Sequence, residues 1–220
     1  MILPEALRLI VITDEELAAP RSVEWVVEEV LKAGVRAIQL RDKSASARTL
    51  LEQALRLRGQ TQRWGALFFV NDRLDVALAA SADGVHLGPD DLPVHAARRA
   101  SPSGFLIGAS ADQPQVAKRL QAEGADYIGC GAVFPTSTKK DAGEVIGVGG
   151  LARVGAAVEI PVVGIGGVDP GGACRIAQGS TAAGIAVIGA VMAARDPGSA
   201  ARKLLEPFQG GPVDPAGNAR

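Results

Sequence analysis

The feature that most constrains the fold of this chain is a unit that recurs eight times along it. Each unit has a short apolar run followed by an amphipathic segment. In the first unit, residues 9–12 form the apolar run, and residues 23–33 carry apolar side chains at helical spacing between Ser22, a predicted N-cap, and Gly34, a predicted helix end. The apolar runs are continuous rather than alternating, which is typical of parallel strands that are covered by helices.

Eight such units in 220 residues predict an α/β fold, a closed (β/α)8 TIM barrel. We expect one barrel domain over residues 1–208 and a disordered, Gly/Pro-rich tail over 209–220. An open doubly wound sheet is the alternative, although residues 13–16 lack the glycine fingerprint usual after its first strand. We expect strands at residues 9–12, 35–40, 67–70, 84–87, 106–109, 127–129, 161–165 and 183–188.

Composition excludes some classes of partner. The formal net charge of −1 gives no bulk attraction to nucleic acid or to an anionic membrane. The sequence contains neither an apolar run long enough to span a bilayer nor a signal-peptide pattern, so we expect a cytoplasmic protein. Cys130 and Cys174 match no metal or redox spacing, and we expect both to be small buried apolar residues in a reducing compartment. Whether the chain forms a homo-oligomer is left open.

Glycines follow the last two predicted strands. In this fold the active site lies where strands end and βα loops begin. Gly166 and Gly167 follow the seventh strand, and Gly189 follows the eighth. Backbone N–H groups at such positions can hold an anion, so we interpret them as a phosphate site, with simple turn glycines as the alternative.

Charged residues follow other strands and are expected at the same mouth. Arg41, Lys43 and Lys139 supply positive charge. Asp72 and Asp91 follow neighbouring strands, where two carboxylates can share a hard cation such as Mg²⁺. Asp91 also fits a helix N-cap before Pro93, so the residues alone leave its metal role open.

The two histidines and one long loop are less informative. His86 lies within a predicted strand and fits a core residue as well as a site residue, whereas His95 is expected on a helix surface. Residues 134–147 form a long connection without apolar periodicity, which favours a lid over a plain surface loop.

Several motifs in order make the chain resemble the thiamine phosphate synthase family through about residue 206. They are QLRDK at 39–43, VND at 70–72, ADGVHLGPDDL at 82–92, IGAS at 107–110, GADYIGCGAVFPTSTKKD at 124–141 and PVVGIGG at 161–167. The resemblance implies a (β/α)8 barrel that joins a 4-amino-5-hydroxymethyl-2-methylpyrimidine diphosphate to a hydroxyethylthiazole phosphate, which in some cases carries a carboxylate. The products are thiamine phosphate and pyrophosphate. It also implies a dissociative reaction in which pyrophosphate leaves first and the thiazole nitrogen then attacks the pyrimidine methylene cation.

The resemblance assigns roles residue by residue. Asp72 and Asp91 would bind Mg²⁺. The residues implied to hold the pyrimidine diphosphate are Gln39, Leu40, Arg41, Asp42, Lys43, Asn71, Ser110 and Lys139, of which Arg41, Lys43, Asn71, Ser110 and Lys139 would act in catalysis. The residues implied to hold the thiazole phosphate are Thr136, Ser137, Thr138, Gly167, Ile188 and Gly189.

The sequence departs from the family pattern at four places. Gly189 stands where Ser is frequent, Pro89 where Gln is common, Asp112 where His is common, and Ala183 where Asp is frequent. Two other functions compete with coupling: a related barrel that aromatises the thiazole tautomer, and a phosphate-ligand sensor without catalysis. The intact diphosphate and metal motifs favour the coupling enzyme, with phosphorylated small molecules as its partners.

Overall fold

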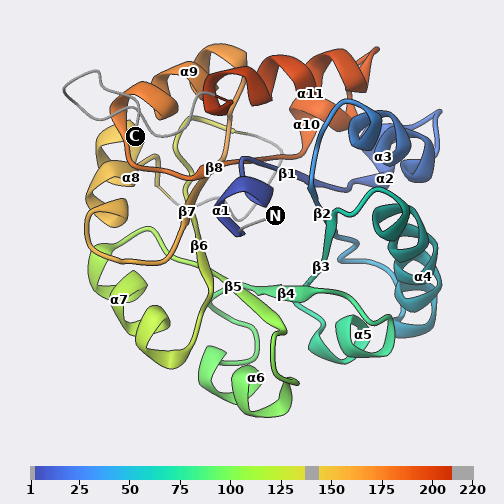
Figure 1. Cartoon of the computed structure of the whole chain (residues 1–220), viewed down its shortest axis with the longest axis horizontal. Coiled ribbons are helices and arrows are strands. Elements are labelled where there is room, and N and C mark those ends of the chain that lie inside the picture. Colours follow the sequence, from blue (N-terminus) through green and yellow to red (C-terminus); the bar gives the residue numbers. More distant parts are fainter. Residues whose placement is uncertain (1–2, 137–143, 210–220) are drawn as a thin grey trace.

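The computed structural model describes residues 3–136 and 144–209, and in them eight parallel strands close into a barrel surrounded by helices (Figure 1). The strands follow one another around the barrel in chain order, and β8 pairs with β1. The predicted TIM barrel is therefore confirmed, and the open doubly wound sheet is wrong. The tail 210–220 lies outside the described residues.

The strands begin and end within two residues of their expected positions. Their bounds are β1 Leu9–Ile12, β2 Ala37–Leu40, β3 Leu67–Asn71, β4 Gly84–Leu87, β5 Leu106–Ser110, β6 Tyr127–Cys130, β7 Val162–Ile165 and β8 Gly184–Val187.

The helices form the outer ring, except that the short α1 lies across the barrel centre (Figure 1). Ser22 caps α3 by accepting a hydrogen bond from the Trp25 N–H, as predicted, and Gly34 follows the helix with φ of 104°. The helix bounds are α1 Leu3–Ala6, α2 Glu15–Ala18, α3 Val23–Lys32, α4 Ala47–Arg63, α5 Leu74–Ala79, α6 Val94–Ala100, α7 Pro114–Glu123, α8 Gly147–Gly155, α9 Pro170–Gly179, α10 Gly189–Met192 and α11 Pro197–Leu205, followed by a 3-10 turn at Glu206–Phe208.

Two Asp–Arg pairs fasten the amino-terminal end of the barrel. Asp83, just before β4, accepts a hydrogen bond of 2.8 Å from the Phe68 N–H and a bidentate pair from Arg58. Asp126, just before β6, accepts a hydrogen bond of 2.7 Å from the Ile107 N–H and a hydrogen bond from Arg98. Each carboxylate thus joins two neighbouring strands to a helix.

The two cysteines differ in their surroundings. Cys130 is buried, and burial, together with the Asp112 charge, raises the pKa of its thiol to about 12. Cys174 is exposed on α9, so the expectation that both are buried is wrong for this residue. No helix in residues 3–136 or 144–209 is long and apolar enough to cross a bilayer.

Candidate active site

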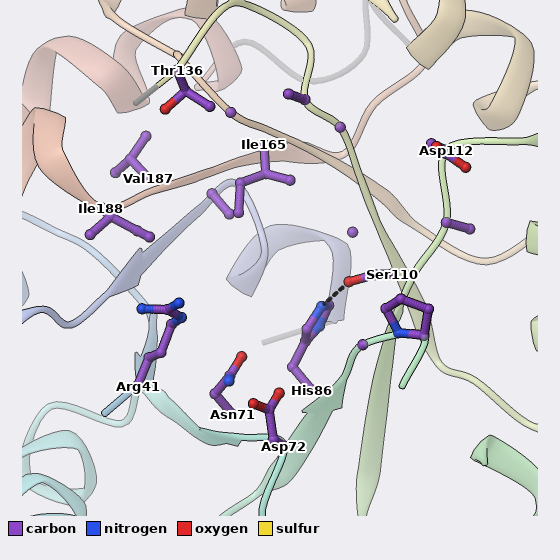
Figure 2. Close-up of a pocket in the computed structure, with 18 of the residues that line it drawn as sticks. Arg41, Asn71, Asp72, His86, Ser110, Asp112, Thr136, Ile165, Val187 and Ile188 are labelled. Carbon is purple, nitrogen blue, oxygen red and sulfur yellow. Dashed lines mark hydrogen bonds between the residues drawn. The ribbon is translucent and has the colours of Figure 1, made fainter. Parts of the chain in front are cut away.

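A cavity of about 590 Å³ opens at the carboxyl ends of the strands. Residues at or just after seven of the eight strands, β2 to β8, line it. Figure 2 shows side chains from opposite sides of the barrel pointing into this space. The barrel therefore brings together residues that lie between positions 41 and 190 in the sequence.

Most of the predicted site residues share this one cavity. Those that line it are Arg41, Lys43, Asn71, Asp72, Asp91, Ser110, Thr136, Gly167, Ile188 and Gly189. Gln39, Leu40 and Asp42 are not among its lining residues. The expectations for Ser137, Thr138 and Lys139, and most of the predicted lid, fall outside the described residues.

Leu40 and Asp42 have structural surroundings instead. Leu40 is buried in the core. The Asp42 carboxylate accepts hydrogen bonds from the Ser44 and Ala45 N–H groups and from the Gln53 side chain, which fixes the loop after β2. The motif at 39–43 therefore mixes residues that face the cavity with residues that shape the loop.

Asp72 and Asp91 meet across the ends of β3 and β4. Asp72 has φ of 63°, in the left-handed region that non-glycine residues seldom adopt, and its N–H donates to the His86 carbonyl. Burial, followed by hydrogen bonding and charge repulsion from Asp91, raises the pKa of Asp72 to about 6, while Lys43 and Arg41 oppose the rise. Two carboxylates held face to face in this way attract a cation.

The alternative role of Asp91 as a helix N-cap is excluded. The residue at the N-cap of α6 is Pro93, and no side chain caps that helix. The Asp91 Oδ2 instead accepts a hydrogen bond of 2.7 Å from the Gly88 N–H, which closes the loop after β4 and directs the carboxylate toward Asp72.

Arg41 is positioned by a residue that sequence reasoning did not select. The buried Thr13 hydroxyl accepts a hydrogen bond of 2.9 Å from the Arg41 N–H and lies 3.4 Å from its carbonyl oxygen. Arg41 then reaches into the cavity beside Asn71 and Asp72, which come from the neighbouring strand (Figure 2). Thr13 directly follows β1, and that position at a strand end was the one available signal.

The glycines after β7 form a tight cradle. Gly166 and Gly167 have φ of 97° and 63°. A Cβ at Gly167 would lie 2.3 Å from the Pro135 carbonyl oxygen, and one at Gly166 would lie 2.7 Å from the Ala132 Cα. Only glycine fits at either position, so these residues do more than permit a turn. The Phe134 N–H donates to the Gly166 carbonyl and ties this cradle to the loop that carries Thr136.

His86 belongs to the site and His95 does not. His86 lines the cavity, and its Nε2 lies 3.0 Å from the Ser110 Oγ (Figure 2). The sequence had left open whether His86 is a core residue or a site residue, and the structure places it at the site. The side chain of His95 on α6 is 52% exposed. Asp112 and Arg119 also line the cavity, and sequence reasoning had not assigned either of them to the site.

Such a site defines a class of protein. A closed (β/α)8 barrel whose carboxyl-end cavity combines a glycine cradle, basic side chains and facing carboxylates belongs to the TIM-barrel enzymes suited to phosphorylated small molecules. Among the described residues no group of three or more His, Cys, Asp or Glu side chains could hold a metal. An ion bound by Asp72 and Asp91 would therefore take its remaining ligands from other groups.

Comparison with known proteins makes the assignment specific: the chain belongs to the thiamine monophosphate synthase family, whose model matches residues 9–191. It is 49% identical to the thiamine-phosphate synthase of Archaeoglobus fulgidus over 93% of this chain and 94% of that protein. It is 46% identical to that of Pyrococcus furiosus over 96% and 100%.

A solved structure agrees with the sequence comparisons. The thiamine phosphate pyrophosphorylase from Pyrococcus furiosus superimposes with a TM-score of 0.87 at 43% identity, over 94% of this chain and 98% of that one. A 3-hexulose-6-phosphate synthase has a TM-score of 0.67 at 19% identity, which shows a shared fold alone.

Proposed function

We propose that this enzyme makes thiamine phosphate by joining 4-amino-5-hydroxymethyl-2-methylpyrimidine diphosphate to hydroxyethylthiazole phosphate or its carboxylated form, with release of pyrophosphate. One observation carries the proposal. A single cavity holds basic side chains and facing carboxylates at the ends of β2 to β4, and a glycine cradle after β7. Family membership supports the product, and the two kinds of anion-binding group support two phosphorylated substrates.

The diphosphate is assigned to the side of the cavity formed by β2 to β5. Arg41 offers a two-pronged guanidinium and Lys43 a point charge, while Asn71 and Ser110 offer neutral hydrogen bonds. Lys139 is assigned to the same diphosphate from its position in the sequence. Gln39 acts from below the cavity, because it is buried beside Tyr127.

Asp72 and Asp91 fit a Mg²⁺ ion. Their carboxylates face each other and repel, and hard oxygen ligands in a pair, completed by substrate phosphates, are what Mg²⁺ prefers. When bound, the ion would supply positive charge to the leaving diphosphate. The left-handed backbone at Asp72, just after β3, positions that carboxylate, and the hydrogen bond from the Gly88 N–H positions the carboxylate of Asp91.

The reaction is a substitution at the pyrimidine methylene carbon. The C–O bond breaks first, and its electron pair leaves with pyrophosphate, so negative charge grows on the leaving group while the methylene carbon becomes cationic. Arg41 and Lys43 line the cavity, where they would stabilise that growing charge. The thiazole nitrogen then donates its lone pair to the carbon. No proton has to be removed for either step, so no general base is required.

The thiazole phosphate is assigned to the cradle side. Gly166 and Gly167 bring their backbone close to the cavity, and Ile188, Gly189 and Thr136 complete the lining there. The glycine at position 189 retains a backbone N–H but has no hydroxyl, so this phosphate would be held mainly by main-chain groups.

The test is product detection with the purified protein. We expect thiamine phosphate and pyrophosphate in equal amounts from the two substrates with Mg²⁺, and a loss of turnover after chelation that added Mg²⁺ restores. Binding of both substrates without turnover would identify a sensor, and isomerisation of a thiazole tautomer without coupling would identify the related isomerase. We also propose the cytoplasm as its compartment, since an exposed unpaired Cys174 suits a reducing environment.

A further inference from the structure

Four polar side chains form a chain of contacts inside the barrel, beneath the cavity. Gln39 on β2 lies beside the Tyr127 phenol on β6. The Tyr127 hydroxyl lies 3.0 Å from the His86 Nδ1 on β4, and the His86 Nε2 lies 3.0 Å from the Ser110 Oγ on β5 (Figure 2 shows the last of these contacts). The chain therefore runs from a buried amide to a hydroxyl that lines the cavity.

Two inward-facing glycines make room for this chain. A Cβ at Gly108 would lie 2.1 Å from the Tyr127 Cζ, and a Cβ at Gly129 would lie 2.9 Å from the His86 Cε1. Neither ring could occupy its place beside a larger residue. The glycines of the IGAS and YIGC segments thus fix where Tyr127 and His86 stand.

The direction of each hydrogen bond follows from the buried end. Burial raises the pKa of Tyr127 above its ordinary value, so the phenol stays protonated. A buried phenol hydrogen needs an acceptor, and the His86 Nδ1 lies 3.0 Å from the phenol oxygen, so Tyr127 donates to His86. An imidazole that accepts at Nδ1 carries its proton on Nε2 and donates to Ser110 Oγ, which leaves the serine hydrogen free to point elsewhere.

We propose that His86 is a positioning residue, held by Tyr127 as the Nε2–H tautomer, which makes Ser110 present its hydroxyl hydrogen to the substrate. The serine can then donate to a hydrogen-bond acceptor of the substrate, such as an unprotonated ring nitrogen of an aromatic heterocycle. In the opposite tautomer the Ser110 hydrogen would point at the His86 Nε2 and could not reach the substrate. The identity of the heterocycle rests on the proposed function, but the tautomer does not.

The tautomer is measured in the free protein by ¹⁵N NMR of the imidazole rings. A His95→Gln variant leaves His86 as the only histidine in the sequence, and His95 is an exposed residue of α6. We expect the His86 Nε2 in the protonated range and Nδ1 in the unprotonated range. A proton on Nδ1, with or without one on Nε2, would overturn the proposal. A failed coupling assay, in contrast, would count against the proposed function alone, because this measurement needs no substrate.

A double-mutant cycle tests whether the chain acts through Ser110. Tyr127→Phe keeps the ring and removes the hydroxyl, and we expect it to raise the KM for the pyrimidine diphosphate about threefold to tenfold, the range expected for one neutral hydrogen bond. In a Ser110→Ala background the same change should raise KM less than about twofold. Equal effects in both backgrounds would mean that Tyr127 only supports the barrel, and the proposal would fail. Thermal unfolding of each variant establishes that the proteins compared are folded.

Discussion

The two ends of the barrel use the same residue type for opposite purposes. At the amino-terminal end, Asp83 and Asp126 are each satisfied by an arginine and a backbone N–H. At the carboxyl end, Asp72 and Asp91 face each other, and the pKa of Asp72 rises to about 6. An aspartate paired with an arginine stabilises the fold. Two aspartates that face each other destabilise it by charge repulsion, and a cation bound between them would relieve that repulsion.

The position of these four aspartates relative to their strands matches their roles. Asp83 and Asp126, just before strands, meet arginines of the surrounding helices, whereas Asp72 and Asp91, just after strands, line the cavity. Barrel enzymes in general place stability at the first end and chemistry at the second. The predictions below test the contrast, from the largest expected effect to the smallest.

The largest effect is expected for Asp72→Asn in catalysis. The change removes a charge from the metal pair with little change in shape, and we expect the coupling rate with Mg²⁺ to fall about 100-fold or more, equal to roughly 3 kcal/mol of transition-state stabilisation. Steady-state kinetics measure it. Asp75→Asn is the matched control, since its side chain is 65% exposed and pairs with Arg73, and it should turn over like the wild type. Undiminished turnover of the Asp72 variant would refute the metal assignment.

Asp126→Ala should reduce stability instead of turnover. It removes the acceptor for the Ile107 N–H and the partner of Arg98, and we expect a loss of about 2 kcal/mol in the free energy of unfolding and a Tm lower by roughly 4 to 8 °C. Thermal and urea unfolding measure the loss of stability. At temperatures below the unfolding transition, kcat should stay near the wild-type value. A large fall in kcat with an unchanged Tm would erase the distinction between the two ends.

Asp72→Asn should stabilise the metal-free protein at neutral pH. The Asp72 carboxyl has a pKa of about 6 in the folded protein, against an ordinary value of 3.8. Its protonated form therefore stabilises the fold fully below pH 3.8, and this stabilisation is lost as the pH rises through 6. We therefore expect the variant to exceed the wild type by about 1 kcal/mol at pH 7, after allowance for solvent screening, and to match it near pH 4. Urea unfolding in the presence of a chelator measures this. A destabilised variant at pH 7 would show that Asp72 is satisfied in the fold.

Thr13→Val should give the smallest effect. It leaves the Arg41 N–H without its hydroxyl acceptor, so the guanidinium loses its anchor, and we expect the KM for the diphosphate substrate to rise about threefold to tenfold. Thr13→Ser retains the hydroxyl and should remain within about twofold of the wild type. A Thr13→Val variant with the wild-type KM would show that this hydrogen bond does not position Arg41.

Much of the fold was predictable because its signals are local. Continuous apolar runs, helical spacing and caps such as Ser22 depend on a few neighbouring residues, and they located every strand within two residues. The short α1, α2 and α10 were not predicted, since four-residue helices carry too little periodicity. The exposure of Cys174 was predicted wrongly, because burial depends on what packs against α9.

The site was predictable as a list of strand-end residues but not as a geometry. Arg41, Asp72 and Gly167 were selected because the active site of this fold lies where strands end and βα loops begin, and all three line the cavity. Asp42, from the same motif as Arg41, instead fixes a loop, and no pattern in the sequence separates the two. Thr13 and the chain from Gln39 to Ser110 depend on contacts between strands far apart in sequence.

By itself, the sequence determined the order of strands and helices, the barrel they close and the family to which the chain belongs, because each of these depends on patterns within short segments. Tertiary structure alone decided which aspartates are paired with arginines and which face each other, and which hydroxyls are committed to buried partners. The physical reason is that charge repulsion and hydrogen-bond direction act across a few ångströms of space, between side chains that only the closed barrel brings together.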